Sequence, residues 1–154
     1  MKEKTCCFTG HRTLTHDEEK ALATRLEVAI REHISRGYRY FGAGGALGFD
    51  TLAAEVVLSL KTEFPDIALI LVLPCKDQAK YWKKEDAFTC ECIKARADKC
   101  VYVSDTYTQG CMLKRNRHLV DNSSSCIAYL RSETGGTAYT VRYAEKRGVP
   151  VHHL

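Results

Sequence analysis

Residues 38–74 have the sequence YRYFGAGGALGFDTLAAEVVLSLKTEFPDIALILVLP, and the order of residue types in this stretch decides the fold. A short strand-like run at 38–41 leads into a glycine-rich loop, and a helical pattern of apolar residues follows at about 50–63. The run at 67–73 is continuously apolar, which is typical of a parallel strand buried on both faces. Strands joined by a helix of this length pair in parallel through a right-handed crossover, so the stretch predicts a parallel α/β sheet.

The same alternation of strand and helix continues in both directions along the chain. The further predicted strands cover residues 5–9, 100–103, 126–130 and 149–152. The further predicted helices cover residues 16–36, 78–97 (as one helix or two), 110–122 and 136–147. Together these elements predict a single Rossmann-like α/β domain over residues 1–154, with a mostly parallel central sheet and helices on both faces.

The composition is that of an ordinary globular domain. The 154 residues are 45% hydrophobic and 27% charged, which excludes disordered and fibrous classes. No apolar run approaches the roughly 20 residues that cross a bilayer, and the first apolar run is too short for a signal peptide. We therefore expect a cytoplasmic protein without a membrane partner. The net charge of +4 permits an anionic ligand but lacks the strong basic excess common in nucleic-acid-binding proteins.

Eight cysteines could indicate disulfides, a metal site or buried thiols. They are Cys6, Cys7, Cys75, Cys90, Cys92, Cys100, Cys111 and Cys126. Without a secretory signal, a disulfide framework is disfavoured. The Cys90-Glu91-Cys92 pair lacks the two-residue spacer and the distant second pair of a structural zinc site. The sequence thus predicts free thiols that behave as small hydrophobic side chains, and no metal site.

Ligands of open parallel sheets bind beyond the carboxyl ends of the strands, so the loops at that edge are the candidate site. The first predicted strand ends in Thr9-Gly10-His11-Arg12. Gly10 allows a tight turn, Thr9 offers a hydroxyl, and the guanidinium of Arg12 suits a phosphate or carboxylate. A plain turn with a solvated arginine is the alternative.

The glycine-rich loop after the second strand contains Gly42, Gly44, Gly45 and Gly48. Because each glycine costs backbone entropy, their density favours a nest of backbone N–H groups around a phosphate. The loop is neither a Walker loop nor a dinucleotide fingerprint. Asp50 follows it, either as a helix cap or as an acceptor for a sugar hydroxyl. Glu55, one turn later, faces either the site or solvent.

Two further segments complete the predicted site. Gly135, Gly136 and Thr137 directly precede the last helix, where they form an anion cradle or a turn with a capping threonine. In the helix at 110–122, Arg115 and Arg117 flank Asn116 and diverge by about 200°, so only one of the two arginines reaches a ligand.

Two further pairs of ring-bearing residues are less indicative of a site. For Tyr81-Trp82 we favour packing in the core over covering a nucleobase. His152 and His153 are interpreted as residues of a terminal strand rather than as ligands.

Four motifs carry a resemblance to a known family. They are Phe8-Thr9-Gly10-His11-Arg12, residues 45–55, Arg115-Asn116-Arg117 and Gly135-Gly136-Thr137. In this order along nearly the whole chain they resemble the SLOG superfamily, and its YpsA-like branch is the most similar. The resemblance implies a Rossmann-like fold and a nucleotide-derived ligand, with ADP-ribose or NAD-like molecules the usual proposal for the family.

Two other branches imply alternative functions. DprA-like proteins share the loop layout and bind single-stranded DNA. LOG-type phosphoribohydrolases cleave the base from a nucleoside monophosphate with a Gly-Gly-x-Gly-Thr-x-x-Glu motif. Here the glutamate position falls on Thr140 or Val141, depending on the glycines aligned, and neither can act as an acid or base. Hydrolysis would then depend on Glu55 or Asp50.

The sequence therefore predicts a sensor or regulator that binds a phosphate-bearing, nucleotide-derived small molecule such as ADP-ribose or NAD and requires no cofactor. The predicted ligand-binding residues are Thr9, Gly10, His11, Arg12, Gly44, Gly45, Gly48, Asp50, Arg115, Asn116, Gly135, Gly136 and Thr137. A nucleotide N-glycosidic hydrolase with Glu55 or Asp50 as its carboxylate is the second hypothesis, and single-stranded DNA binding is the third. Relatives self-associate, so the resemblance also implies a homodimer. We expect Arg12→Ala and Gly45→Ala to abolish ligand binding and to leave the fold intact.

Overall fold

Six strands form one central sheet in the computed structural model, which describes all residues 1–154. The strands are β1 (Thr5–Thr9), β2 (Tyr40–Ala43), β3 (Ala68–Leu73), β4 (Lys99–Tyr102), β5 (Ser125–Ala128) and β6 (Val151–His153). The helices are α1 (His16–Ser35), α2 (Phe49–Leu60), α3 (Lys84–Arg96), α4 (Cys111–Asp121) and α5 (Gly136–Lys146), and a 3-10 turn, η1 (Lys2–Lys4), precedes β1.

The strand order is β4-β3-β2-β1-β5-β6, and every neighbouring pair is parallel. The chain fills one half of the sheet outward from β1 and then returns through α4 to place β5 on the other side of β1. The predicted Rossmann-like α/β fold is confirmed, with a sheet that is parallel throughout.

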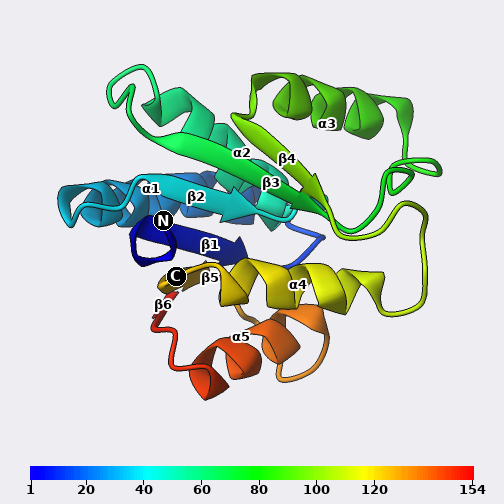
Figure 1. The fold of residues 1–154 in the computed structure, drawn as a ribbon. Helices are drawn as coiled ribbons and strands as arrows, with labels where there is room; N and C mark the ends of the chain where they lie inside the picture. The colour runs from blue at the N-terminus through cyan, green and yellow to red at the C-terminus, as the bar shows by residue number, and fades with distance from the viewer.

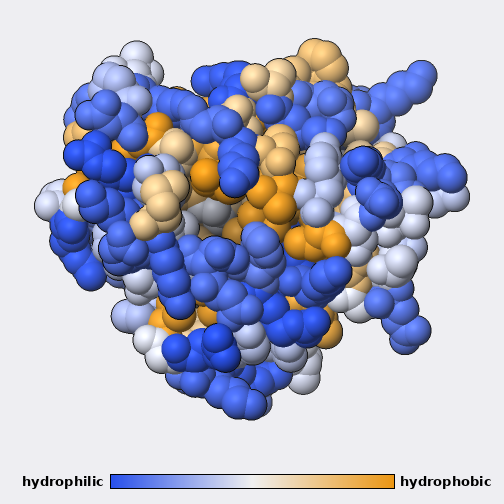
Figure 2. Space-filling view, viewed as in Figure 1, coloured by the Kyte–Doolittle hydropathy of each residue, from blue (hydrophilic) through white to orange (hydrophobic).

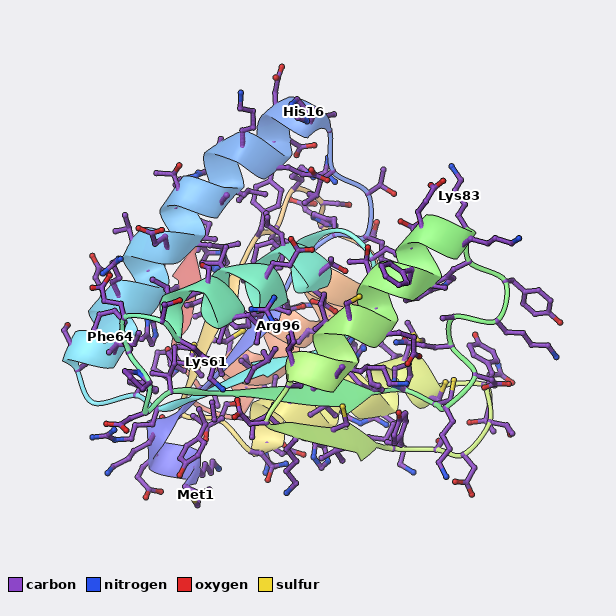
Figure 3. The ribbon with its side chains drawn as sticks, turned by 90° about the horizontal axis from the view of Figure 1, so that it is seen from above. Met1, His16, Lys61, Phe64, Lys83 and Arg96 are labelled. Carbon is purple, nitrogen blue, oxygen red and sulfur yellow. The ribbon has the colours of Figure 1, made fainter.

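The helices lie in two layers, as predicted. α1, α2 and α3 cover one face of the sheet, and α4 and α5 cover the other (Figure 1). Seen from above, the three helices of the first layer lie side by side (Figure 3). His16, at the start of α1, and Lys83, directly before α3, lie toward the same end of this layer (Figure 3). The helix starts therefore gather at one edge of the sheet, where the strands end.

The main core lies between the sheet and the layer of α1 and α2. The ring of Phe8 in β1 stacks on that of Phe41 in β2, with centroids 6.2 Å apart. It also meets the ring of Phe49, the first residue of α2, edge-on at 6.5 Å. These buried rings fix the end of β1 against the start of α2, which positions the loops that follow β1 and β2.

The other face of the sheet is less completely covered. α4 packs under β1 and β3, and α5 packs under β1, β5 and β6. A shallow hollow beside α4 is lined by Gly42, Ile70, Val72 and Val101, among others. Figure 2 shows hydrophobic side chains over β3 and β4 in this region. The two faces of the sheet are thus unequally buried.

The segment between β3 and α3 departs most from the sequence prediction. A helix was expected from residue 78, but α3 begins at Lys84, and the residues before it form turns. Polar contacts explain the difference: the Asp77 carboxylate accepts from the Tyr107 N–H at 3.1 Å, and the Gln78 amide donates to the Gly45 carbonyl at 3.1 Å. These bonds tie the segment to neighbouring loops. The predicted packing of Tyr81-Trp82 in the core is wrong, because Tyr81 is 90% exposed.

Other boundaries differ by a few residues. β2 begins at Tyr40 rather than at residue 38, because the Tyr38 N–H donates to the His33 carbonyl and closes the end of α1. β5 ends at Ala128, and His152 and His153 lie in the terminal strand β6, as expected.

All eight cysteines are free thiols. The buried ones are Cys6, Cys7, Cys75, Cys111 and Cys126. No three histidine, cysteine or acidic side chains gather as a metal site would require. None of the helices combines the length and the apolar character needed to cross a membrane.

Candidate functional site

The candidate site lies at the carboxyl end of β1, where the chain changes sides of the sheet. Such a switch point between neighbouring strands leaves a crevice in open parallel sheets. Here the crevice holds a cavity of about 200 Å³. Its lining residues are Phe8, Thr9, Gly10, His11, Arg12, Ala46, Asp50, Met112, Leu113, Arg115, Asn116, Gly136 and Thr137. Four segments far apart in the sequence thus meet at one cavity.

Close packing joins the loop after β1 to the start of α2. A Cβ atom at Gly10 would overlap the ring of Phe49, and one at Gly48 would overlap the backbone carbonyl of Arg12. The Phe49 N–H donates to the His11 carbonyl at 3.0 Å. Only glycine allows this approach, so the two loops pack directly against each other.

Arg115 is a buried tie between α4 and the glycine-rich loop. Its side chain is only 4% exposed, and its Nη1 donates to the Gly44 carbonyl. Its Nε donates to the Asn116 side chain at 2.7 Å. A Cβ atom at Gly44 would lie 2.6 Å from Nη1 of Arg115 and 2.7 Å from Oδ2 of Asp50. Gly44 therefore makes room for a buried arginine and a buried carboxylate.

Burial governs the charges of this pair. It raises the pKa of the Asp50 carboxyl, although the nearby guanidinium groups of Arg115 and Arg12 act in the opposite direction. Burial likewise lowers the pKa of Arg115, and Asp50 opposes that shift. Asp50 is not the helix cap, because Gly48 holds the N-cap position of α2; its Oδ2 instead accepts from the Ala46 N–H at 3.3 Å.

The glycines at 44, 45 and 48 do not line the cavity. Gly45 has a φ of +71°, and a Cβ atom there would overlap the side chain of Leu73. Close contacts with a side chain or a neighbouring backbone therefore account for these three glycines in the structure. The expectation that Gly45→Ala leaves the fold intact is contradicted by this geometry.

β1 and α5 instead contribute polar residues to the cavity wall. Thr9 and Thr137 are each 7% exposed, and neither hydroxyl forms a hydrogen bond within the protein. The N-cap of α5 is Gly135, which offers no side chain to the helix start, so the predicted alternative of a capping threonine is wrong. The first N–H groups of a helix have no partner within it. Those of Gly136 and Thr137 belong to residues that line the cavity.

This arrangement suits an anion. A helix start carries partial positive charge, and its free N–H groups bind phosphate and carboxylate oxygens. The exposed side chain of Arg12 borders the same cavity. The cavity can therefore hold a phosphate between the start of α5, two hydroxyls and an arginine, and we call it the anion cavity.

Arg12 also borders two neighbouring hollows. One, of about 700 Å³, contains Glu55 together with Glu19 and Lys83. Burial, and the charge of Glu19, raise the pKa of Glu55. Glu55 does not line the cavity that holds Asp50, so the structure does not bring the two carboxylates to one place.

The second neighbouring hollow contains Tyr81 and Trp82, for which the sequence favoured core packing over covering a nucleobase; apart from Arg12, its other residues were not predicted as a site. It encloses about 510 Å³ and shares Arg12 and Met112 with the anion cavity. Its other lining residues are Asp77, Gln78, Lys80, Tyr81, Trp82 and Tyr107. Met112 could have been found from its spacing, because it precedes Arg115 and Asn116 by three and four positions on one helix face.

The remaining predicted residues have identifiable contacts. Nε2 of His11 accepts from the Arg131 N–H at 2.8 Å, and burial lowers the pKa of His11. Arg117 turns away from the cavity, and its Nη1 contacts the Tyr139 hydroxyl at 3.1 Å, so the two arginines of α4 diverge as expected. The hydroxyl of Thr140 donates to the Gly136 carbonyl at 2.7 Å, and Val141 is buried.

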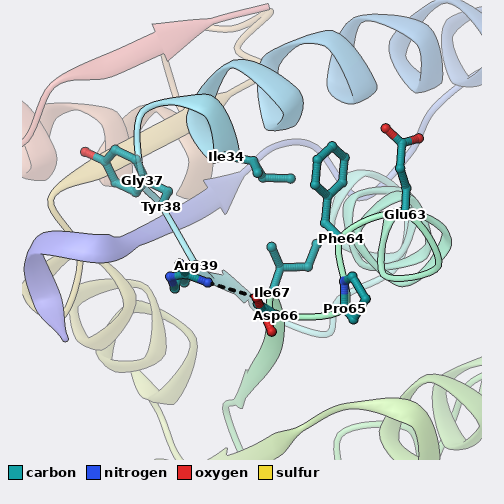
Figure 4. Close-up of a pocket in the computed structure, with 9 residues that line it drawn as sticks. All are labelled: Ile34, Gly37, Tyr38, Arg39, Glu63, Phe64, Pro65, Asp66 and Ile67. Atoms are coloured by element: carbon teal, nitrogen blue, oxygen red, sulfur yellow. Dashed lines mark ion pairs between the residues drawn. The ribbon is translucent and has the colours of Figure 1, made fainter.

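A separate cavity of about 280 Å³ lies at the opposite end of the sheet (Figure 4). It lies beside Gly37, which follows α1, and Phe64, which follows α2, and it includes the ion pair of Arg39 with Asp66 at 3.5 Å. Helix carboxyl ends carry partial negative charge, which disfavours an anion there. The candidate site for a phosphate is thus confined to the edge at which the strands end.

Comparisons with known proteins agree with this architecture. The model of the YspA SLOG family (YpsA) matches residues 6–151. An SPbeta prophage-derived protein of Bacillus subtilis (strain 168), YoqJ, is 29% identical over 138 residues, which cover 81% of each chain. A UPF0398 protein of Bacillus thuringiensis (strain Al Hakam) is 28% identical over 133 residues, which cover 84% of this chain and 70% of the relative.

Two solved structures share the fold. DNA processing protein A from Helicobacter pylori, described with its single-stranded DNA binding mode, has a TM-score of 0.71 at 20% identity. DNA processing protein A from Streptococcus pneumoniae has a TM-score of 0.68 at 17% identity. Each match covers 99% of this chain, and the chain spans 65% and 50% of those structures, respectively. At these identities the likeness is one of fold.

Proposed function

Because the chain belongs to the YspA SLOG family, we propose that it binds a phosphate-bearing, nucleotide-derived small molecule and acts as a sensor or regulator. ADP-ribose and NAD are the ligand class we assign. One observation supports the proposal: Thr9 and Thr137, largely buried residues, line the cavity at the start of α5, and their hydroxyls form no hydrogen bond within the protein and stay accessible from the cavity. A hydroxyl that is free at a cavity wall can donate a hydrogen bond to a ligand, and the oxygens of a phosphate would act as the acceptors.

The charges around the cavity support an anionic ligand. Arg12 is exposed and borders the cavity, so its guanidinium is available to a phosphate. Arg115 is already engaged by Gly44 and Asn116. We therefore assign the charge-neutralising role to Arg12, and we assign to Arg115 the role of holding the glycine-rich loop in place.

Thermal melting against a panel of nucleotides tests the proposal. Ligand binding to the folded state at 100 times Kd adds about 2.7 kcal/mol of stability, which for a domain of this size raises Tm by about 5–10 °C. The panel contains ADP-ribose, NAD, nucleoside monophosphates and a short oligonucleotide. A shift with ADP-ribose or NAD supports the proposal, and the absence of a shift with every small nucleotide contradicts it.

Two variants localise the binding. Arg12→Ala removes an exposed guanidinium and should weaken ADP-ribose binding about 10- to 100-fold. Gly136→Ala adds a methyl group to the cavity wall, where the only atom within 4 Å of the new Cβ is Nδ2 of Asn116 at 3.9 Å, and should weaken binding about 10-fold. Arg25→Ala, an exposed change on α1, is the matched control. Unchanged affinity in both site variants would overturn the placement of the site.

A nucleotide N-glycosidic hydrolase is the second candidate function, and one observation favours it. The pKa of Asp50 is raised inside the cavity, and a carboxyl with a raised pKa can donate a proton to a leaving group. For each nucleotide that raises Tm, analysis of the products shows whether the protein releases the base. Base release that is lost in Asp50→Asn and kept in Glu55→Gln would assign the reaction to Asp50. The opposite pattern would assign it to Glu55.

A further inference from the structure

We infer that the hollow beside the anion cavity is a nucleobase subsite, with Trp82, Tyr81 and Tyr107 as its stacking surface. The inference rests on the proposed function and extends it, because it assigns the nucleobase of the ligand to residues outside the anion cavity. The proposed occupant of the hollow is the base of the same small molecule whose phosphate would bind at the start of α5.

Exposed aromatic side chains are the first observation. Tyr81 is 90% exposed and Tyr107 is 65% exposed, and both line one hollow together with Trp82. Aromatic side chains bury large apolar areas in a fold, so exposing several at one place leaves that stabilisation unused. Flat rings that reach solvent beside a cavity provide the surface on which nucleobases stack.

The continuity of the two cavities is the second observation. Arg12 and Met112 line both the anion cavity and the aromatic hollow. A phosphate near Arg12 is therefore next to the aromatic hollow. The anion cavity has a volume of about 200 Å³ and the aromatic hollow one of about 510 Å³. The larger space is therefore the one assigned to the base, which is larger than a phosphate.

Hydrogen bonds hold the aromatic segments in position, which is the third observation. The Tyr107 N–H donates to Asp77 at 3.1 Å, and the Lys76 N–H donates to the Asp105 carbonyl at 3.1 Å. The Gln78 side chain donates to the Gly45 carbonyl at 3.1 Å. The loop after β3 is thus fixed both to the loop after β4 and to the glycine-rich loop. An aromatic surface positioned before ligand binding loses little conformational entropy when a base stacks on it.

Trp82 is the only tryptophan of the chain, so its fluorescence reports on this hollow alone. ADP-ribose is the probe with a base, and ribose 5-phosphate is the probe without one. We expect ADP-ribose to change the Trp82 emission with the same midpoint as its calorimetric binding curve. Ribose 5-phosphate should bind more weakly and leave the emission unchanged.

Variants separate stacking from folding. Trp82→Leu and Tyr107→Ala should each weaken ADP-ribose binding about 5- to 100-fold and leave ribose 5-phosphate affinity unchanged. Trp82→Phe keeps a flat ring and should retain most of the affinity. Phe88→Ala is the matched control, because Phe88 is 71% exposed and lies outside the hollow. Melting temperatures of the unliganded variants check that each one folds.

Each outcome has one meaning. Binding of ADP-ribose with unchanged Trp82 emission and unchanged affinity in Trp82→Leu and Tyr107→Ala overturns the base subsite and leaves the proposed function standing. No binding of either probe overturns the proposed function for this ligand class, and the subsite falls with it. An oligonucleotide that binds the hollow more tightly than ADP-ribose would reassign the aromatic surface to single-stranded nucleic acid and overturn the inference.

Discussion

Arg115 illustrates how a charged residue beside a cavity can be engaged by contacts within the fold. Its guanidinium is 4% exposed and bonded to the Gly44 carbonyl and to Asn116. The sequence predicted it as a ligand-binding residue because it lies on the helix after β4, and in the structure it lines the candidate cavity. Its burial depends on a contact with a loop 71 residues earlier, which no local pattern encodes.

Arg115→Ala should lower the free energy of unfolding by about 2–4 kcal/mol, because it leaves the Gly44 carbonyl without its donor, removes a positive charge near the buried Asp50 and empties a buried side-chain volume. Urea denaturation measures the change. Arg12→Ala, which removes an exposed arginine of the same cavity, should lie within about 0.5 kcal/mol of the unchanged protein. Equal effects of the two substitutions would contradict the roles assigned to them.

We expect the buried His33 to make the stability depend on pH. Burial lowers its pKa from 6.5, with Arg36 and His152 acting in the same direction and the Ala29 carbonyl and Glu32 opposing. Its Nδ1 donates to the Ala29 carbonyl, and its Nε2 accepts from the Ser125 hydroxyl, both at 2.8 Å. The unfolded chain therefore takes up the proton first. This contribution to stability is complete above about pH 6.5 and is lost as the pH falls toward the lowered pKa.

The free energy of unfolding should therefore decrease between pH 7.5 and pH 5.5, with a slope from His33 of at most about 1.4 kcal/mol per pH unit. Urea denaturation at both pH values measures it, and the window lies above the usual titration range of carboxylates. His33→Gln should reduce the slope. His11→Asn is the control for the other histidine with a lowered pKa. An undiminished slope in His33→Gln would refute the assignment.

At the scale of helices, strands and loops, periodicity predicted the elements well and the connections poorly. The apolar spacing of α1 is local information, and its bounds agree with the prediction within one residue. The segment before α3 has helix-forming residues, yet Asp77 and Gln78 bond to residues of distant loops. Because these partners come from elsewhere in the chain, the turn and the exposed Tyr81 could not be read from the local sequence.

The glycines of the loops should respond to alanine in a fixed order of stability loss. Gly45→Ala combines a φ of +71° with overlap of Leu73 and should cost about 2–4 kcal/mol. Gly148→Ala has a φ of +75° and open space around it, so only the backbone term of about 1–2 kcal/mol applies. Gly136→Ala has neither problem and should change stability by less than about 0.5 kcal/mol. Thermal or urea unfolding of the three variants checks the order.

For the whole molecule, the strand and helix alternation was sufficient to predict the fold class, and the loops after the strands predicted the edge at which the structure has the candidate cavity. The glycine-rich loop was interpreted as a phosphate nest, yet Gly44, Gly45 and Gly48 lie outside the cavity. Glycine density indicates close approach of the backbone, and the sequence does not say whether a ligand, a side chain or another loop comes close.

Thiol accessibility tests the arrangement of the entire sheet. Cys92 is exposed and should react with iodoacetamide in the native protein. Burial raises the pKa of Cys90 and of Cys100, so these half-buried thiols should react more slowly. The five buried thiols should react only after unfolding. Mass spectrometry of timed samples gives the order, and rapid native labelling of Cys7 or Cys126, which lie on neighbouring central strands, would contradict the fold.

The open space beside Gly136 has a consequence for how such a domain diverges. A side chain would overlap neighbouring atoms at four glycines of the loops, so a substitution at any of them lowers the stability of the fold. These are Gly10, Gly44, Gly45 and Gly48. Gly136 has ordinary backbone geometry and room for a side chain, while it also borders the cavity. In the course of evolution, a single substitution at Gly136 could therefore change which ligands the cavity binds, and the fold would keep its stability without a compensating second substitution.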